Sequence, residues 1–179
     1  MNPLWSYAWP ALLIGLIPGL IAGIIGFRLP RSTEPSAISP EMRRKRYLTL
    51  GAGVAVTLAG AALWHGPFGA ADRFSKHVER DLHGALVYYE MAQQVTAHLH
   101  HGPLTRNVIL SGSGDDFQRS ELARLMGQIP GVRSANWTGR GGTPLIVEGL
   151  AVSLLGFLLG LLLAYLIELR RRYNSQWNW

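Results

Sequence analysis

Histidine is the residue type whose spacing in this chain of 179 residues comes closest to a chemical motif. The segment HLHH holds His98, His100 and His101, and neutral imidazoles bind zinc, copper and nickel. On a helix, His98 and His101 would share one face while His100 points elsewhere, and no acidic residue is near in the sequence. We expect these side chains to cap a helix end or to face solvent, and a metal site at His98 and His101 is the alternative.

The glycine-rich segment SGSG at 111–114 is the second candidate for chemistry. It lacks the Gly-Lys-Ser/Thr ending of a phosphate-binding loop and leads into Asp115 and Asp116, whose charges would repel phosphate. Ser111, Ser113 and the histidines also lack the spacing of a nucleophile elbow. We predict a turn here and a protein that is not an enzyme, with no catalytic residues, no cofactor and no small-molecule substrate.

Glu148 is an acidic residue close to the core of a predicted span. A carboxylate inside a membrane is a candidate for proton or ion handling. Glu148 follows Thr143 and Pro144, which suit the N-cap and first residue of a helix, so it would lie in the second turn, where water and the helix dipole favour an anion. We expect an interfacial carboxylate, and a proton relay is the alternative.

Three uncharged runs predict the elements that carry these residues, and we expect transmembrane helices at 8–27, 47–64 and 149–167. The first run has 20 residues, enough for a helix to cover about 30 Å of hydrocarbon. The second is rich in Gly and Ala, and the third is rich in Leu. A hydrophobic content of 48% also favours a membrane protein, and the absence of cysteine excludes disulfides and thiolate metal sites.

Lys and Arg cluster on one predicted side of the membrane and account for the whole formal charge of +6. By the positive-inside rule, a bacterial inner-membrane protein with this pattern has a periplasmic N-terminus and a cytoplasmic C-terminus. The excess lies at membrane ends, which argues against nucleic acid as a partner and for anionic lipid headgroups. The basic residues expected to contact headgroups are Arg43, Arg44, Lys45, Arg46, Arg170, Arg171 and Arg172.

Aromatic and small residues mark two further features of the spans. Aromatic anchors at the membrane interfaces are expected at Trp5, Trp9, Trp64, Tyr173, Trp177 and Trp179. Stripes of small residues four apart let helices approach closely, and they are Gly15, Gly19 and Gly23; Gly51, Ala55 and Ala59; and Gly156, Gly160 and Ala164. Two explanations stay open, because such stripes can pack the protein's own helices together or receive helices of other subunits.

The region between the second and third spans predicts a small α/β domain. Helical spacing over 72–101 indicates one long helix, or two broken near Gly84, stopped by Gly102 and Pro103. A strand at 107–112, a second helix and a last strand at 132–137 follow. The second helix is predicted to start with a capping box of Asp115 and Gln118 and to bury Phe117, Leu122, Leu125 and Ile129.

This order of elements resembles a BON-type domain over residues 88–137. The family pattern is an apolar alternation ending in Leu-x-Gly, an amphipathic helix, and Gly-Val before the final strand, and the matching residues are Val108, Leu110, Gly112, Gly131 and Val132. The chain leaves little room for the family's usual first strand and turn between Leu99 and Asn107. The resemblance implies a non-enzymatic module that contacts phospholipid or protein at the cell envelope.

Together these features predict a membrane protein with three transmembrane helices and a small αβαβ, BON-like extracytoplasmic domain between helices 2 and 3. The predicted parts are an N-terminal tail and helix at 1–28, a basic cytoplasmic loop at 29–46, a helix at 47–64, the periplasmic domain at 65–143, a helix at 144–169 and a cytoplasmic tail at 170–179. We expect a non-catalytic accessory subunit held by larger integral membrane subunits and lipids, with an energy-transducing complex, respiratory or photosynthetic, as its host. The alternative is an envelope tether that binds phospholipid or cell-wall components.

Overall fold

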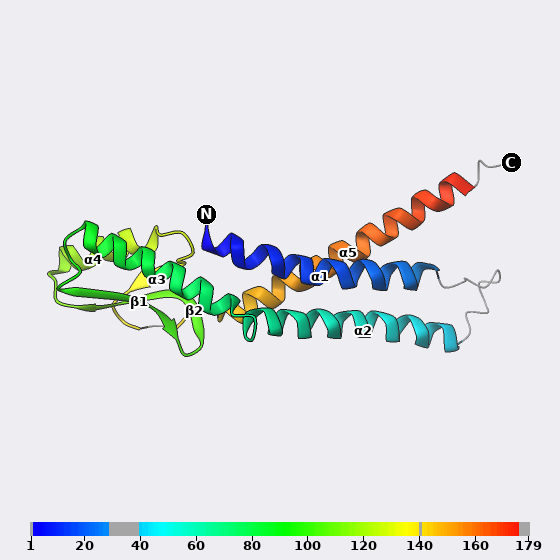
Figure 1. Cartoon of the computed structure of the whole chain (residues 1–179), viewed down its shortest axis with the longest axis horizontal. Helices are drawn as coiled ribbons and strands as arrows, with labels where there is room; N and C mark the ends of the chain where they lie inside the picture. The colour runs from blue at the N-terminus through cyan, green and yellow to red at the C-terminus, as the bar shows by residue number, and fades with distance from the viewer. Residues whose placement is uncertain (1, 29–39, 140, 176–179) are drawn as a thin grey trace. The chain divides into compact units, whose positions relative to one another are not determined.

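Two compact units make up the chain. The residues that the computed structural model describes are 2–28, 40–139 and 141–175. The residues of the unit that we call the sheet unit are Met1–Ala8 and Trp64–Gly149, and those of the helical unit are Trp9–Leu63 and Leu150–Trp179. The boundaries fall inside three long helices, which are α1 (Pro3–Arg28), α2 (Pro40–His65) and α5 (Leu145–Ser175) (Figure 1).

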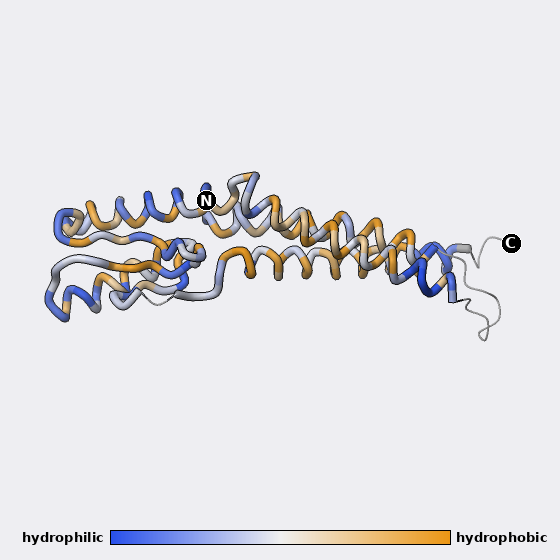
Figure 2. Tube along the Cα trace, turned by 90° about the horizontal axis from the view of Figure 1, so that it is seen from below, coloured by the Kyte–Doolittle hydropathy of each residue, from blue (hydrophilic) through white to orange (hydrophobic). Residues whose placement is uncertain are grey.

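All three long helices are long and apolar enough to cross a membrane. Each contains one of the uncharged runs in the sequence, and hydrophobic residues cover most of its length in the helical unit (Figure 2). A helix of 26 residues, such as α1 or α2, rises about 39 Å, which exceeds the roughly 30 Å of a bilayer's hydrocarbon core. The protein therefore has the elements of a three-span membrane protein.

The helices extend beyond the apolar runs at their charged ends. The predicted loop at 29–46 is helical from Pro40 onwards, while its residues 29–39 lie outside the described part of the chain. The predicted tail at 170–179 is likewise helical as far as Ser175. Hydropathy marks the part of a helix that lipid can cover, whereas Lys, Arg and Glu favour the helical backbone in water.

The sheet unit places two helices and three strands in the order α-β-β-α-β. Its elements are α3 (Ala70–Tyr88), β1 (Val95–His101), β2 (Leu104–Gly112), α4 (Asp116–Gly127) and β3 (Ser134–Asn136). Strand β2 lies in the middle of the sheet, antiparallel to β1 and parallel to β3. The sequence predicted only two of these strands.

The prediction of helix up to residue 101 is wrong, because residues 95–101 form strand β1. Val95 and Leu99 are four residues apart, which fits one face of a helix and equally one face of a strand. Both are buried, and Ala97 between them is half-buried, so the burial has a period of two. Gly102 and Pro103, expected to stop the helix, instead form the hairpin turn between β1 and β2.

Helix α3 runs unbroken through Gly84 and ends at Tyr88 without a glycine. Glu90 takes the left-handed conformation, with φ of 58°, that usually falls to glycine at helix ends. The N–H of Met91 then donates to the carbonyl of Leu86 at 2.9 Å, which closes the last turn. Because the usual glycine is missing, the sequence alone did not show this boundary.

One face of the sheet and the two helices form the core of the sheet unit. Val95 and Leu99 of β1 pack with Val108 and Leu110 of β2, and α3 and α4 cover them with Val78, Leu82, Leu122 and Met126. The capping box of Asp115 and Gln118 is confirmed, and Leu122 is buried as predicted. Phe117 is 77% exposed, so its predicted burial is wrong, and Met126 takes the core position instead.

Candidate interaction surfaces and the anchored helix ends

Two of the three small-residue stripes pack against each other in the helical unit. A Cβ atom added at any glycine of the α1 stripe would collide with α5, and one added at either glycine of the α5 stripe would collide with the backbone of α1. The stripe residues at this contact are Gly15, Gly19 and Gly23 on α1, and Gly156, Gly160 and Ala164 on α5. Glycine therefore brings the two backbones into direct contact.

Two α5 residues that the sequence did not single out complete this packing. The hydroxyl of Ser153, fully buried, donates to the carbonyl of Ala11 on α1 at 2.8 Å. Phe157 is also buried, and a Cβ atom at Gly53 of α2 would lie 2.9 Å from its ring. The sequence offered two signals, a serine within an apolar helix and one aromatic residue among leucines. Neither signal identifies the residue that the side chain contacts.

The third stripe, on α2, faces away from the helices of its own unit. A Cβ atom at Gly51 would meet none of the described atoms within 4 Å, and Ala55 and Ala59 are exposed. Helix α2 buries Thr57 and Ala61 instead, on the opposite side. The stripe Gly51, Ala55 and Ala59 is therefore open, and we call it the open stripe of α2.

An apolar groove lies beside the open stripe, between α1 and α2. It has a volume of about 640 Å³. Its lining includes Ile17, Ile21 and Ile25 of α1 and Leu48, Ala52 and Val56 of α2. Residues of α2 form both the open stripe and one wall of the groove. This side of the helical unit therefore has a groove and, beside it, a surface of small residues.

Glu148 belongs to an ion-pair cluster in the sheet unit. Its carboxylate accepts a hydrogen bond from Nη1 of Arg106 on β2 at 3.1 Å and lies 3.9 Å from Nη1 of Arg133. Arg106 also donates from Nε to the carbonyl of Gly131 at 2.9 Å. The side chains of Arg106 and Glu148 are only 19% and 23% exposed, so solvent screens their pairing weakly.

This cluster gives Glu148 a role that the sequence did not show. The first turns of α5 are bound to β2 through one carboxylate and one guanidinium from residues 42 positions apart. Neither arginine was a candidate in the sequence, because Arg106 in β2 and Arg133 just before β3 give no local sign of a partner in a distant helix. The cluster supplies a structural reason for the acid near the apolar run.

Tyr7 joins the ends of three helices in the sheet unit. It is 4% exposed, and its hydroxyl lies 2.8 Å from Nδ1 of His65 and 3.3 Å from the carbonyl of Leu145, to which it donates. The indole N–H of Trp64 donates to the carbonyl of Tyr7 at 3.1 Å. The start of α1, the end of α2 and the start of α5 are thus tied to one side chain and its backbone.

The predicted aromatic anchors differ in their surroundings. Trp5 and Trp9 are 62% and 50% exposed, and Tyr173 is also exposed. Trp64 is half-buried, because its N–H is bonded to Tyr7 and the guanidinium of Arg73 lies 5.2 Å from its ring centroid. The predicted anchors Trp177 and Trp179 lie outside the described residues.

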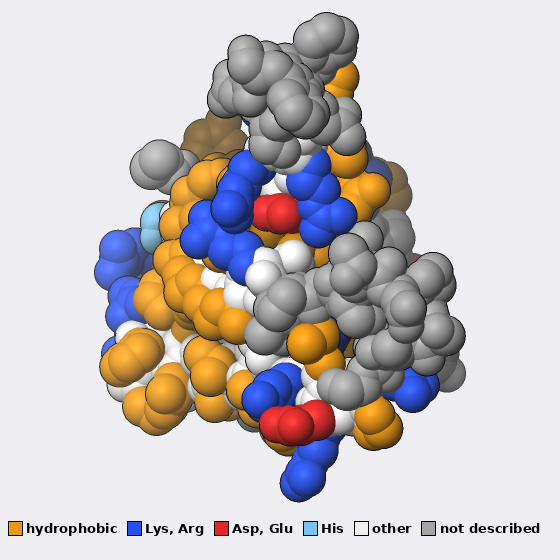
Figure 3. Space-filling view, turned by 90° about the vertical axis from the view of Figure 1, so that its right-hand side faces the viewer, with side chains coloured by type: hydrophobic (Ala, Val, Ile, Leu, Met, Phe, Trp, Pro, Cys, Tyr) orange, Lys and Arg blue, Asp and Glu red, His pale blue; other side chains and the backbone are white. Residues whose placement is uncertain are grey.

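Basic residues at the charged ends of α2 and α5 are paired in part with acids on the same helix. Lys45 lies 3.0 Å from Glu41, and Glu168 is bonded to Arg172 at 3.0 Å and lies 3.8 Å from Arg171. Figure 3 shows acidic side chains with Lys and Arg side chains next to them on this face, and hydrophobic side chains around these charged groups. Arg43, Arg44 and Arg170 are exposed and Arg46 is half-buried.

Among the described residues, no group of three or more His, Asp or Glu side chains is placed to hold a metal ion. Nε2 of His101 lies 2.7 Å from Oε1 of Glu79 on α3. The same carboxylate oxygen accepts the N–H of Leu99 at 3.3 Å. Glu79 is 22 residues away from His101 in the sequence, so the fold and not the local sequence supplies this acidic neighbour.

The chain is thus defined by its structure as one with three helices able to span a membrane and a small three-stranded sheet covered by two helices. No family model, curated protein or solved structure matches it. The BON-type resemblance therefore stays a prediction.

The ion-pair cluster can be tested with Glu148→Gln. We expect a loss of about 2 kcal/mol from the sheet unit, because the guanidinium of Arg106 loses its charged partner. Hydrogen–deuterium exchange at residues 104–112 should become roughly 30-fold faster. In the control, Asp72→Asn, which breaks the exposed pair with Lys76, the change should stay below about 0.5 kcal/mol. Unchanged exchange together with loss of an ion- or proton-coupled activity would favour the relay.

The glycine contact can be tested with Gly19→Leu. A leucine at this position has no space against the backbone of Phe157, so we expect the helical unit to lose about 3 kcal/mol or to come apart. Gly26→Leu is the matched control, since a Cβ atom at Gly26 meets no described atom within 4 Å. The measurement is unfolding of the purified protein by sodium dodecyl sulfate, followed by circular dichroism. Equal losses in both variants would contradict direct contact between the backbones.

Proposed function

We propose that the protein is a non-catalytic accessory subunit of a membrane complex and that a helix of a partner subunit packs on the open stripe of α2. The observation that carries this proposal is the outward face of Gly51, Ala55 and Ala59. The other two stripes already satisfy each other within the helical unit. The open stripe is left as the surface on which another helix can approach closely.

The outward faces of the other two helices support this reading. Exposed positions of α5 are large, with Leu155, Leu158 and Leu162, and those of α1 carry Ile17 and Ile21, which line the groove beside α2. Leucine and isoleucine suit contact with acyl chains, whereas glycine and alanine are enriched where helices meet. Helix α2 also exposes Val56, Leu58 and Leu63, but its stripe is the one that its own unit leaves uncovered, which favours α2 as the helix that meets a partner.

A BON-like character for the sheet unit is part of the proposal. Its order, α-β-β-α-β, includes a strand and turn ahead of β2, and these are the elements for which the sequence showed little room. Strand β1 occupies residues 95–101, for which the sequence predicted a helix. A module of this kind would hold the partner's extramembrane surface without chemistry of its own.

The proposed location is a bacterial inner membrane, with the N-terminus in the periplasm and the C-terminus in the cytoplasm. This orientation rests on the basic residues near the charged ends of α2 and α5 and on the neutral balance of residues 65–148. The proposed host is an energy-transducing complex, respiratory or photosynthetic. This choice rests on the abundance of such complexes and not on any residue of the chain.

Partner binding can be tested with Ala55→Leu. The added side chain should keep a partner helix from close approach and lower the partner recovered in mild detergent about tenfold. Ala151→Leu is the control, because Ala151 is an exposed alanine on α5 outside the stripes. Quantitative mass spectrometry of the purified material from native membranes gives the ratio. Recovery of the unaltered protein only as a lone monomer would contradict the proposal.

Orientation can be tested by labelling single cysteines, since the chain has none of its own. Ser113→Cys, on the exposed segment between β2 and α4, should react with a membrane-impermeant maleimide in intact spheroplasts. Lys45→Cys, at the basic end of α2, should react only after the membrane is permeabilised. The reverse pattern would show that the sheet unit faces the cytosol.

A further inference from the structure

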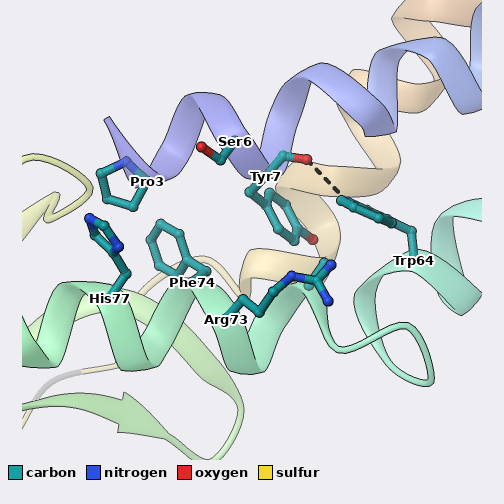
Figure 4. A pocket seen from close by; sticks show the side chains of 8 residues that line it. Pro3, Ser6, Tyr7, Trp64, Arg73, Phe74 and His77 are labelled. Atoms are coloured by element: carbon teal, nitrogen blue, oxygen red, sulfur yellow. Dashed lines mark hydrogen bonds between the residues drawn. The ribbon is translucent and has the colours of Figure 1, made fainter. Parts of the chain in front are cut away.

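A cavity of about 360 Å³ lies in the sheet unit between the start of α1 and the helix α3. Its walls include Tyr7, Trp64 and Phe74, three aromatic side chains. Figure 4 shows Phe74 between Arg73, which extends toward Tyr7 and Trp64, and His77, which points toward Pro3. The cavity therefore combines apolar walls with two groups able to carry positive charge.

Arg73 is held in a defined position at this cavity. Its Nη1 donates to the carbonyl of Phe68 at 2.6 Å, and its guanidinium lies 5.2 Å from the centroid of the Trp64 ring. A guanidinium has five N–H donors, so the bond to Phe68 uses only one of them. The remaining donors suit the oxygens of a phosphate, which arginine binds in a forked geometry.

Two charged pairs lie along this part of α3. Nε2 of His77 lies 3.7 Å from Oδ2 of Asp81, and Lys76 is bonded to Asp72 at 2.8 Å. Of the charged side chains on this part of α3, only Arg73 and His77 line the cavity. Ser6 of α1 also lines it and carries a hydroxyl group that can donate to an oxygen.

The position of the cavity along the chain selects the kind of ligand. It is built where α1 begins and where α2 ends, and both helices are long and apolar enough to cross a membrane. Tryptophan and tyrosine at such helix ends lie at the depth of lipid headgroups. This position favours the phosphate of a phospholipid, whose glycerol and first methylenes would meet the aromatic walls.

We propose that this cavity binds the phosphodiester headgroup of an anionic phospholipid, with the phosphate on Arg73. The site goes beyond the proposed function, because it binds lipid and not a partner subunit. Its lining residues all lie outside residues 88–137, so the BON-type resemblance contributes nothing to it. A soluble phosphate ester shares the recognised chemistry, and the experiment separates the two sources.

The test is native mass spectrometry of the full chain in detergent, titrated with phosphatidylglycerol, with phosphatidylcholine or with glycerol 3-phosphate. We expect one phosphatidylglycerol per chain to be retained, with weaker retention of phosphatidylcholine, whose choline cation would face Arg73 and His77. Arg73→Gln should weaken binding of phosphatidylglycerol about tenfold. Arg73→Lys, which keeps the charge without the fork, should weaken it less.

Arg80→Gln is the matched control, because Arg80 is exposed on α3 two turns beyond Arg73 and does not line the cavity. It should leave the affinity unchanged.

His77→Gln is a second test variant, which leaves the hydrogen bond between Arg73 and Phe68 intact. It should weaken binding two- to threefold. Because it does not remove that bond, it tests the site even where Arg73→Gln causes a folding defect.

Two results would overturn the site. Equal weakening by Arg80→Gln and Arg73→Gln would show a diffuse attraction of lipid to a basic surface. Binding of glycerol 3-phosphate as tight as that of phosphatidylglycerol would show a site for a soluble phosphate ester and not for a lipid.

Discussion

The buried side chain of Tyr7 is the contact on which the organisation of the sheet unit depends. Its hydroxyl meets His65 and Leu145, and its carbonyl meets Trp64, so three helix ends far apart in sequence share one residue. A tyrosine suits this place because its ring fills apolar space beside Phe74 while its hydroxyl serves polar groups at helix ends. The three helix ends are thereby held together within the sheet unit.

The ion pair of Glu148 reinforces the same junction by a different force. Tyr7 acts through hydrogen bonds and packing, whereas Glu148 and Arg106 act through charge in a half-buried setting. Because β2 also pairs with both other strands, a pull on the start of α5 is passed to the centre of the sheet. Movement of this helix end and opening of the sheet are therefore expected to be coupled.

The sequence predicted those features that follow from local composition. Uncharged runs located the three long helices, and the capping box located the start of α4. It misread β1, because Val95 and Leu99 satisfy helical and strand spacing alike and Glu90 ends α3 without a glycine. It also left out Tyr7, Arg106 and Ser153, whose roles arise from partners distant in the chain. Small-residue stripes were visible, but which of them face inward depends on helix rotation, which composition does not contain.

The carboxylate of Glu79 limits how another strand can pair with the sheet unit. It occupies the N–H of Leu99 and the ring of His101 along β1, the outermost strand of the sheet on that side. An incoming peptide that sought to extend the sheet there would have to displace an anion already bound to the backbone. Addition of a strand to this edge is therefore disfavoured at Leu99 as long as the carboxylate of Glu79 stays in place.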